Sequence, residues 1–120
     1  MAITPGRRIP LAHRRLAIID LSADGRQPMT TADGRVTIIL NGEIYNYLEI
    51  KKELEALGRR FDSTSDTEVL LQAYAQWGSG CLARLTGMWA FAILDNSTGE
   101  LFLARDPFGI KPLYYMIVDE

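Results

Sequence analysis

The sequence has 120 residues, which is enough for one domain or for part of one. Hydrophobic residues make up 48% of it, and a net charge of −2 from interspersed charges gives no sign of a nucleic-acid partner or an anionic membrane surface. The single cysteine, Cys81, excludes an intramolecular disulfide, and no stretch has the length of a membrane span or the apolar core of a signal peptide. We therefore expect a single cytoplasmic domain with a core of its own.

The first elements along the chain are expected to be strands. Residues 1–12 contain proline and glycine without periodicity, and predict an arm or loop. A first strand is expected over 15–20, followed by a loop rich in Ser, Asp and Gly over 21–29. Asp33-Gly34 then indicates a turn into a second strand over 35–40, whose apolar, β-branched residues are typical of a buried strand.

The second strand is expected to stop at Asn41-Gly42-Glu43, and this tripeptide has two interpretations. Asn-Gly is the strongest short hairpin signal, so taken alone a simple turn is the favoured interpretation. The alternative is a binding site, because polar groups at the end of a buried strand are fixed by the strand and exposed by the loop.

Two helices are expected to follow. Apolar residues recur at helical spacing from Tyr47 to Leu57, and Gly58 stands where a glycine often ends a helix. Ser65 and Glu68 have the spacing of a capping box and predict the start of a second helix, whose apolar face runs over 70–77.

The last part of the chain is expected to return to strands. A short third helix over 81–85 precedes an apolar run without alternation over 88–94, which predicts a strand covered on both faces. An antiparallel return over 101–104 and a last strand over 113–118 are expected after it. Strands and helices in this order predict an α+β fold, with helices layered against a mainly antiparallel sheet and a further layer on the second face.

Charged and amide groups gather at the boundaries of these elements, and such a set could hold a small zwitterion. Arg15 could grip an α-carboxylate in bidentate fashion, and Asp66 or Glu43 could receive an α-ammonium group. The Asn41 side chain beside the Gly42 N–H makes a plausible oxyanion hole. Each residue also has a simpler explanation: Asp66 suits the positive start of a helix, and Arg15 suits a solvated strand edge. Taken singly, the simpler explanation is favoured for each residue, and residue types alone make the joint binding site a hypothesis.

Five segments together carry a more specific signal. They are 13–22 with Gln27-Pro28-Met29, then 41–47, 65–78, 85–92 and 104–115. In their residues, order and spacing they resemble the signatures of the glutaminase domain of asparagine synthetases. These enzymes are class II glutamine amidotransferases of the N-terminal-nucleophile hydrolase superfamily. The resemblance runs from about residue 13 to 115. It implies an αββα sandwich, of which this chain would be one partial domain spanning residues 1–120.

The resemblance also implies roles for the boundary residues. Arg15 would bind the α-carboxylate of glutamine and Asp66 its α-ammonium group, while Asn41 and Gly42 would form the oxyanion hole and Glu43 would line the pocket. Backbone groups from 16 to 19 would form a pocket wall, at Leu16, Ile18 and Ile19. No metal or cofactor is implied for this domain; ATP and magnesium would serve a separate synthetase domain.

The sequence departs from the family pattern at the nucleophile. The family uses an N-terminal cysteine whose own α-amine is the base, whereas here Met1 is followed by Ala2 and only twelve residues precede His13. Cys81 has no free α-amine beside it and is expected to be structural, although a position at the start of a short helix could lower its pKa. We therefore expect a truncated glutaminase-type domain that lacks its nucleophile and is inactive alone.

Three uses of such a chain stay open. The first is a fragment of an amidotransferase whose parent reaction is hydrolysis of glutamine to glutamate and ammonia, with amide transfer to an acceptor such as aspartate. The second is a catalytically dead module that binds glutamine or a related amino acid. The third is an interaction domain that self-associates as a homo-oligomer through open sheet edges.

Overall fold

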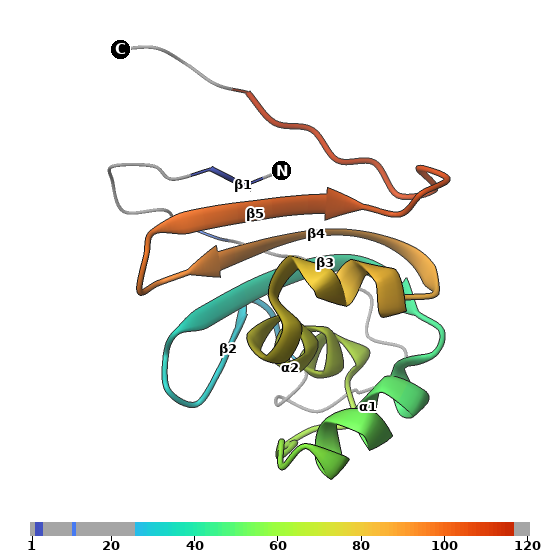
Figure 1. Ribbon diagram of the computed structural model, residues 1–120. Helices are drawn as coiled ribbons and strands as arrows, with labels where there is room; N and C mark the ends of the chain where they lie inside the picture. Colours follow the sequence, from blue (N-terminus) through green and yellow to red (C-terminus); the bar gives the residue numbers. More distant parts are fainter. Residues whose placement is uncertain (1, 4–10, 12–25, 117–120) are drawn as a thin grey trace.

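The computed structural model describes residues 2–3, 11 and 26–116 (Figure 1). The expected first strand over 15–20 lies outside these residues, as do Arg15, Leu16, Ile18 and Ile19. The elements in chain order are β1 (Ala2–Ile3), β2 (Met29–Thr30), β3 (Val36–Ile44), α1 (Tyr47–Ala56), α2 (Asp66–Trp77), the 3-10 helix η2 (Gly78–Arg84), β4 (Gly87–Asp95) and β5 (Glu100–Arg105).

The described strands form one antiparallel sheet in the order β1-β5-β4-β3-β2. Strands β3 and β4 pair over their whole length, from Val36 opposite Asp95 to Ile44 opposite Gly87. Strand β2 covers only the start of β3, where it pairs with Thr37 and Ile38. Beyond Ile38 the outer edge of β3 therefore faces the helices and loops rather than another described strand.

The core lies between one face of the sheet and the helices, which all lie on that side in Figure 1. Ile38, Phe91 and Ile93 on the strands are at most 1% exposed, and Leu54 of α1 and Leu70 of α2 are fully buried against them. Each such side chain contributes about 1.5–3 kcal/mol to the free energy of unfolding. The α+β class with a mainly antiparallel sheet is confirmed.

The opposite face of the sheet is also apolar. Ala90 and Ala92 of β4 and Leu103 of β5 are 5–8% exposed, and the buried run from Trp89 to Ile93 confirms that this strand is covered on both faces. The described helices lie on one side only, so the described residues form one sheet and one helical layer of a partial αββα sandwich.

The two long helices begin and end close to the predicted positions. Ser65 caps α2 by accepting a hydrogen bond at Oγ from Thr67 N (3.1 Å), but the predicted capping box is wrong. The Ser65 N–H donates to Ser63 Oγ instead, and the buried Glu68 carboxylate accepts from Asp62 N and Ser63 N. Because the loop amides of Asp62 and Ser63 donate to the Glu68 carboxylate, that carboxylate does not accept the Ser65 N–H as a capping box requires.

The end of β3 differs most from expectation. The strand does not stop at Leu40 but continues through Asn41-Gly42-Glu43 to Ile44, so the hairpin interpretation and the expected strand end are both wrong. Strand β4 continues beside it, which gives these residues backbone partners. Gly42 permits the pairing, because a Cβ there would lie 2.0 Å from Met88 O and because its φ is 133°.

Three smaller differences concern short elements. The expected third helix exists as the 3-10 helix η2, which begins earlier than predicted. Ala2–Ile3, inside the expected arm, pair with β5 as strand β1. The expected strand over 113–118 is wrong for residues 113–116, since no described strand lies beside them; Tyr114 and Met116 are 90% and 82% exposed. Residues 117–118 lie outside the described part.

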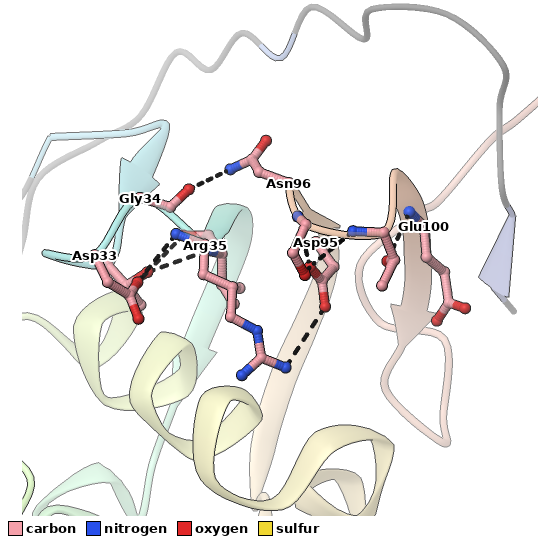
Figure 2. A network of polar contacts seen from close by, with 10 residues as sticks. Asp33, Gly34, Arg35, Asp95, Asn96 and Glu100 are labelled. Carbon is pink, nitrogen blue, oxygen red and sulfur yellow. Dashed lines mark hydrogen bonds and ion pairs between the residues drawn. The ribbon is translucent and has the colours of Figure 1, made fainter.

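At the end of the sheet where β3 begins, polar contacts tie the β2–β3 turn to the β4–β5 turn (Figure 2). Asn96 donates from its side chain to Gly34 O (2.9 Å) and from its backbone to Arg35 O (2.7 Å). Arg35 Nη2 lies 3.7 Å from Asp95 Oδ2, and Asp95 Oδ1 accepts from Ser97 N. These contacts hold β3 and β4 in one register. A shift by one residue would turn the buried side chains of β3 to the opposite face of the sheet.

No helix in the described ranges is long and apolar enough to cross a membrane.

Candidate functional site

The outer edge of β3 carries the candidate site. Leu40 N donates to Gln27 Oε1 (2.5 Å), and Ile44 N donates to Asp66 Oδ2 (2.9 Å). Backbone N–H groups along an antiparallel strand alternate between its two sides. The N–H of Gly42 is therefore directed to the same edge, between the two side-chain acceptors. This arrangement places Gly42 and Asp66 at the same edge of β3.

Asp66 is a buried carboxylate at the start of α2, with 7% of its surface exposed. Burial raises the pKa of this carboxyl above its ordinary value of 3.8; the N–H groups of Ile44 and Thr67 oppose the shift, and the nearby Glu43 charge adds to it. A raised pKa means that the negative charge is incompletely compensated within the protein. A cationic group such as an ammonium would compensate it.

Asn41 and Glu43 alternate with Gly42 along β3 and lie on the sheet face opposite the helices. Asn41 is exposed and Glu43 is partly exposed, so both side chains are accessible to a ligand. Asn41 thus stands next to the Gly42 N–H and Glu43 next to Asp66, which places four of the predicted site residues around one strand segment.

Gln27 also lies at this edge, and the sequence pattern predicts no role for it. Gln27 uses both ends of its amide: Oε1 accepts from Leu40 N, and Nε2 donates to Thr67 Oγ1 (3.1 Å). The signal was present in the segment Gln27-Pro28-Met29, but its spacing from Leu40 and Thr67 gives no hint of the contact. Only the fold brings the three together.

Cys81 is fully buried, and burial raises the pKa of its thiol from 9.0 to about 11. The suggestion that the helix start lowers this pKa is wrong, because desolvation of the thiolate outweighs it. The thiol is protonated at neutral pH and out of reach of a ligand. The structural role expected for Cys81 agrees with both observations.

Two cavities in the described part lie away from this edge. One is lined by the β2–β3 turn, the α1–α2 loop and α2, and the other lies beside it; Arg59 and Gln72 line both. Neither is lined by Asn41, Gly42 or Asp66. Within the described ranges, no group of three or more His, Cys, Asp or Glu side chains could hold a metal ion.

Comparison with known proteins identifies the family of this chain. The glutamine amidotransferase domain family matches residues 2–120. Asparagine synthetase [glutamine-hydrolyzing] 1 of Bacillus subtilis is 50% identical over 107 residues, which cover 89% of this chain and 17% of the relative. Asparagine synthetase [glutamine-hydrolyzing] 3 of the same organism is 49% identical over 105 residues, covering 86% and 17%.

A solved structure shows the same fold. The glutamine phosphoribosylpyrophosphate amidotransferase from B. subtilis, complexed with ADP and GMP, superimposes with a TM-score of 0.68 and 29% sequence identity. The match covers 83% of this chain and 23% of that one. The amidotransferase-type α+β fold predicted from the sequence is confirmed.

The matching family model and the shared fold identify this chain as a glutamine amidotransferase domain, and the chain belongs to that family. Within the family it is similar to the glutaminase part of the glutamine-hydrolysing asparagine synthetases. The chain spans 17% of the length of these two relatives.

Proposed function

We propose that this chain binds L-glutamine at the outer edge of β3 and polarises its side-chain amide for hydrolysis to glutamate and ammonia. The observation that carries the proposal is the hydrogen bond between Asp66 and the edge of β3. The buried, incompletely compensated Asp66 carboxylate accepts from Ile44 N, two residues along the strand from the Gly42 N–H. An ammonium-binding group and an oxyanion donor are thus joined through one strand.

The proposal gives each residue a chemical role. Asp66 receives the α-ammonium group, and the Gly42 N–H and the Asn41 side-chain amide donate to the substrate carbonyl oxygen as negative charge develops on it. Glu43 lines the pocket. Arg15 binds the α-carboxylate, and the backbone around it forms the pocket wall at Leu16, Ile18 and Ile19. Cys81 is given no part, and no nucleophile is assigned among the described residues.

The fate of the ammonia is the second part of the proposal. In relatives named as glutamine-hydrolysing asparagine synthetases this domain is a small share of the protein. By analogy, ammonia released once a nucleophile completes the site would pass to a synthetase domain that uses ATP and magnesium to amidate an acceptor such as aspartate. The glutaminase domain itself takes no metal or cofactor, and the cytoplasm is the compartment expected for this chemistry.

Calorimetric titration with L-glutamine tests the proposal, with D-glutamine as the stereochemical control. We expect the purified chain to bind the L-form only. Asp66→Asn keeps an oxygen that can accept from Ile44 N but removes the charge, so binding should weaken by about tenfold or more, as for the loss of a charged hydrogen bond. Asp33→Asn, at the other end of the sheet, is the matched control and should bind normally.

The pH dependence follows from the same group. Since burial raises the pKa of Asp66, its negative charge is lost at a higher pH than that of an ordinary aspartate, and glutamine binding should weaken as pH falls through this raised value. The charge on the buried Asp66 opposes folding above its pKa, so Asp66→Asn should not lower stability at pH 7. Equal binding of both enantiomers, or unchanged binding by Asp66→Asn, would contradict the proposal.

A further inference from the structure

We propose that Gln27 is a positioning residue of the glutamine site, whose side-chain amide holds the edge of β3, and with it the Gly42 N–H, at a fixed distance from Asp66. This inference rests on the proposed function and concerns a residue to which neither the family resemblance nor the site chemistry assigns a role.

Both ends of the Gln27 amide are engaged, and each contacts a different element. Its Oε1 accepts from Leu40 N of β3 at 2.5 Å, and its Nε2 donates to Thr67 Oγ1 in the first turn of α2 at 3.1 Å. Both partners are 2% exposed, so each bond lies in a setting where an unpaired polar group would be costly. The side chain is a bridge between the strand and the helix.

The bridge matters because no strand in the described part of the chain pairs with this side of β3 after Ile38. From Leu40 onward, side chains occupy the positions that a neighbouring strand would take: Gln27 at Leu40 N and Asp66 at Ile44 N. Gly42 lies midway between these two anchored amides and has a φ of 133°, a conformation that only glycine adopts readily. Its peptide group is therefore oriented by the anchors on either side.

The two links between β3 and α2 meet the helix at neighbouring residues, Asp66 and Thr67. Asp66 holds Ile44 and Thr67 is held through Gln27 to Leu40, so strand and helix are joined twice, on both sides of Gly42. In the proposed complex, Asp66 and the Gly42 N–H contact opposite ends of glutamine. Their separation must match the length of the substrate, and removing one link would allow it to vary.

Three variants separate positioning from simple stability. Gln27→Leu removes both bonds with a side chain of similar size, and Thr67→Val removes only the acceptor of the Gln27 Nε2 bond. Thr67→Ser keeps the hydroxyl and is the conservative control. Thermal unfolding of each variant reports whether the domain stays folded.

The diagnostic measurement is the ratio of the affinities for L-glutamine and L-norvaline, which has the same α-groups and chain length but no side-chain carbonyl. A positioning role predicts that Gln27→Leu weakens L-glutamine binding about tenfold, the loss of one well-aligned hydrogen bond, while L-norvaline binding changes little. Thr67→Val should change the ratio in the same direction, and Thr67→Ser should restore it. Equal weakening of both ligands would reduce Gln27 to a structural role and overturn the inference.

A second measurement needs no ligand. Hydrogen exchange of the Ile44 amide, which is bonded to Asp66 on the other side of Gly42, should be faster in Gln27→Leu, while amides in the centre of the β3–β4 ladder, such as Ile39, keep their protection. Unchanged exchange at Ile44 would overturn the inference even if glutamine does not bind. Absence of stereospecific glutamine binding by the unmodified chain overturns the proposed function, a result distinct from either of these.

Discussion

Gly42 is the residue on which the geometry of the site depends most directly. A Cβ there would lie 2.0 Å from Met88 O and 2.8 Å from the Trp89 Cα, and on the partner strand a Cβ at Gly87 would lie 2.1 Å from Glu43 O. The two glycines thus allow β3 and β4 to approach closely at the end of the ladder where the site lies. Close backbone approach, rather than a turn, explains this glycine.

Replacing Gly42 by alanine should therefore unfold or severely weaken the domain. The added methyl group combines a backbone clash with a φ of 133°, and together we expect about 3 kcal/mol or more of lost stability, measured by urea denaturation. Gly34→Ala is the matched control, since Gly34 also has a positive φ (73°) but open space around it. It should cost only about 1–2 kcal/mol; equal losses at the two positions would contradict the clash.

At this scale the sequence indicated chemistry but not geometry. It predicted that Asp66 and Gly42 share a site. The structure places both at the outer edge of β3, and their shared role stays a prediction. It could not predict that Gln27 lies there too, because nothing in a local pattern fixes which side chain will satisfy Leu40 N. Residue types carry the chemistry, whereas their partners depend on pairing between distant segments.

Among the elements, the loop after β5 depends on one carboxylate. Asp106 is 2% exposed and accepts hydrogen bonds from Trp89 N on β4 and from the loop amides of Phe108, Ile110 and Lys111. Burial alone would raise the pKa of Asp106, but these four backbone donors outweigh it and lower the pKa below 3.8. The charged carboxylate therefore organises the loop and fastens it to the sheet.

Acid should release this loop. Because the folded-state pKa of Asp106 is lowered, its contribution to stability is present above the ordinary value of 3.8 and is lost as pH falls through the lowered value. We expect Asp106→Asn to reduce stability at pH 7 and to flatten its decline between pH 5 and pH 3, both measured by urea denaturation. Asp33→Asn, an exposed turn carboxylate whose pKa is also lowered, is the control and should reduce stability much less. Parallel curves for Asp106→Asn and the unmodified protein would refute this assignment.

Elements whose signals are local were predicted well, and those decided by distant pairing were not. The helices α1 and α2 follow from apolar spacing and from the cap at Ser65, all within a few residues. The length of β3 depends on β4, more than forty residues later, so local sequence wrongly predicts a strand end at Asn41-Gly42. The strand expected at 113–118 has the right residue types, but no described neighbour pairs with residues 113–116.

At the scale of the whole molecule, the exposed residues after β5 form a candidate surface for association with another chain or domain. Large apolar side chains are exposed along 108–116, at Phe108, Ile110, Tyr114, Tyr115 and Met116. A contiguous group of exposed apolar residues typically marks an interaction surface. A synthetase domain and a second copy of the chain are both compatible partners.

Analytical ultracentrifugation of the chain distinguishes them. If a second copy covers this surface, the sedimentation coefficient should rise with concentration, and Tyr114→Ser with Met116→Ser should abolish the rise. Both side chains are more than 80% exposed, so the double variant should leave the free energy of unfolding nearly unchanged. A strictly monomeric species at high concentration would exclude self-association and leave a separate domain as the partner to seek.

The outer strand β1 pairs with β5, a strand that is synthesised much later in translation. Ala2 and Ile3 pair with Phe102 and Leu101, so the first described residues of the chain lie beside some of the last. Strands β4 and β5 are neighbours in sequence and can pair as soon as both exist, whereas β1 has no partner until residue 102 has been synthesised. During translation, residues 2–3 therefore leave the ribosome before their partner strand has been made, and they can join the sheet only after it.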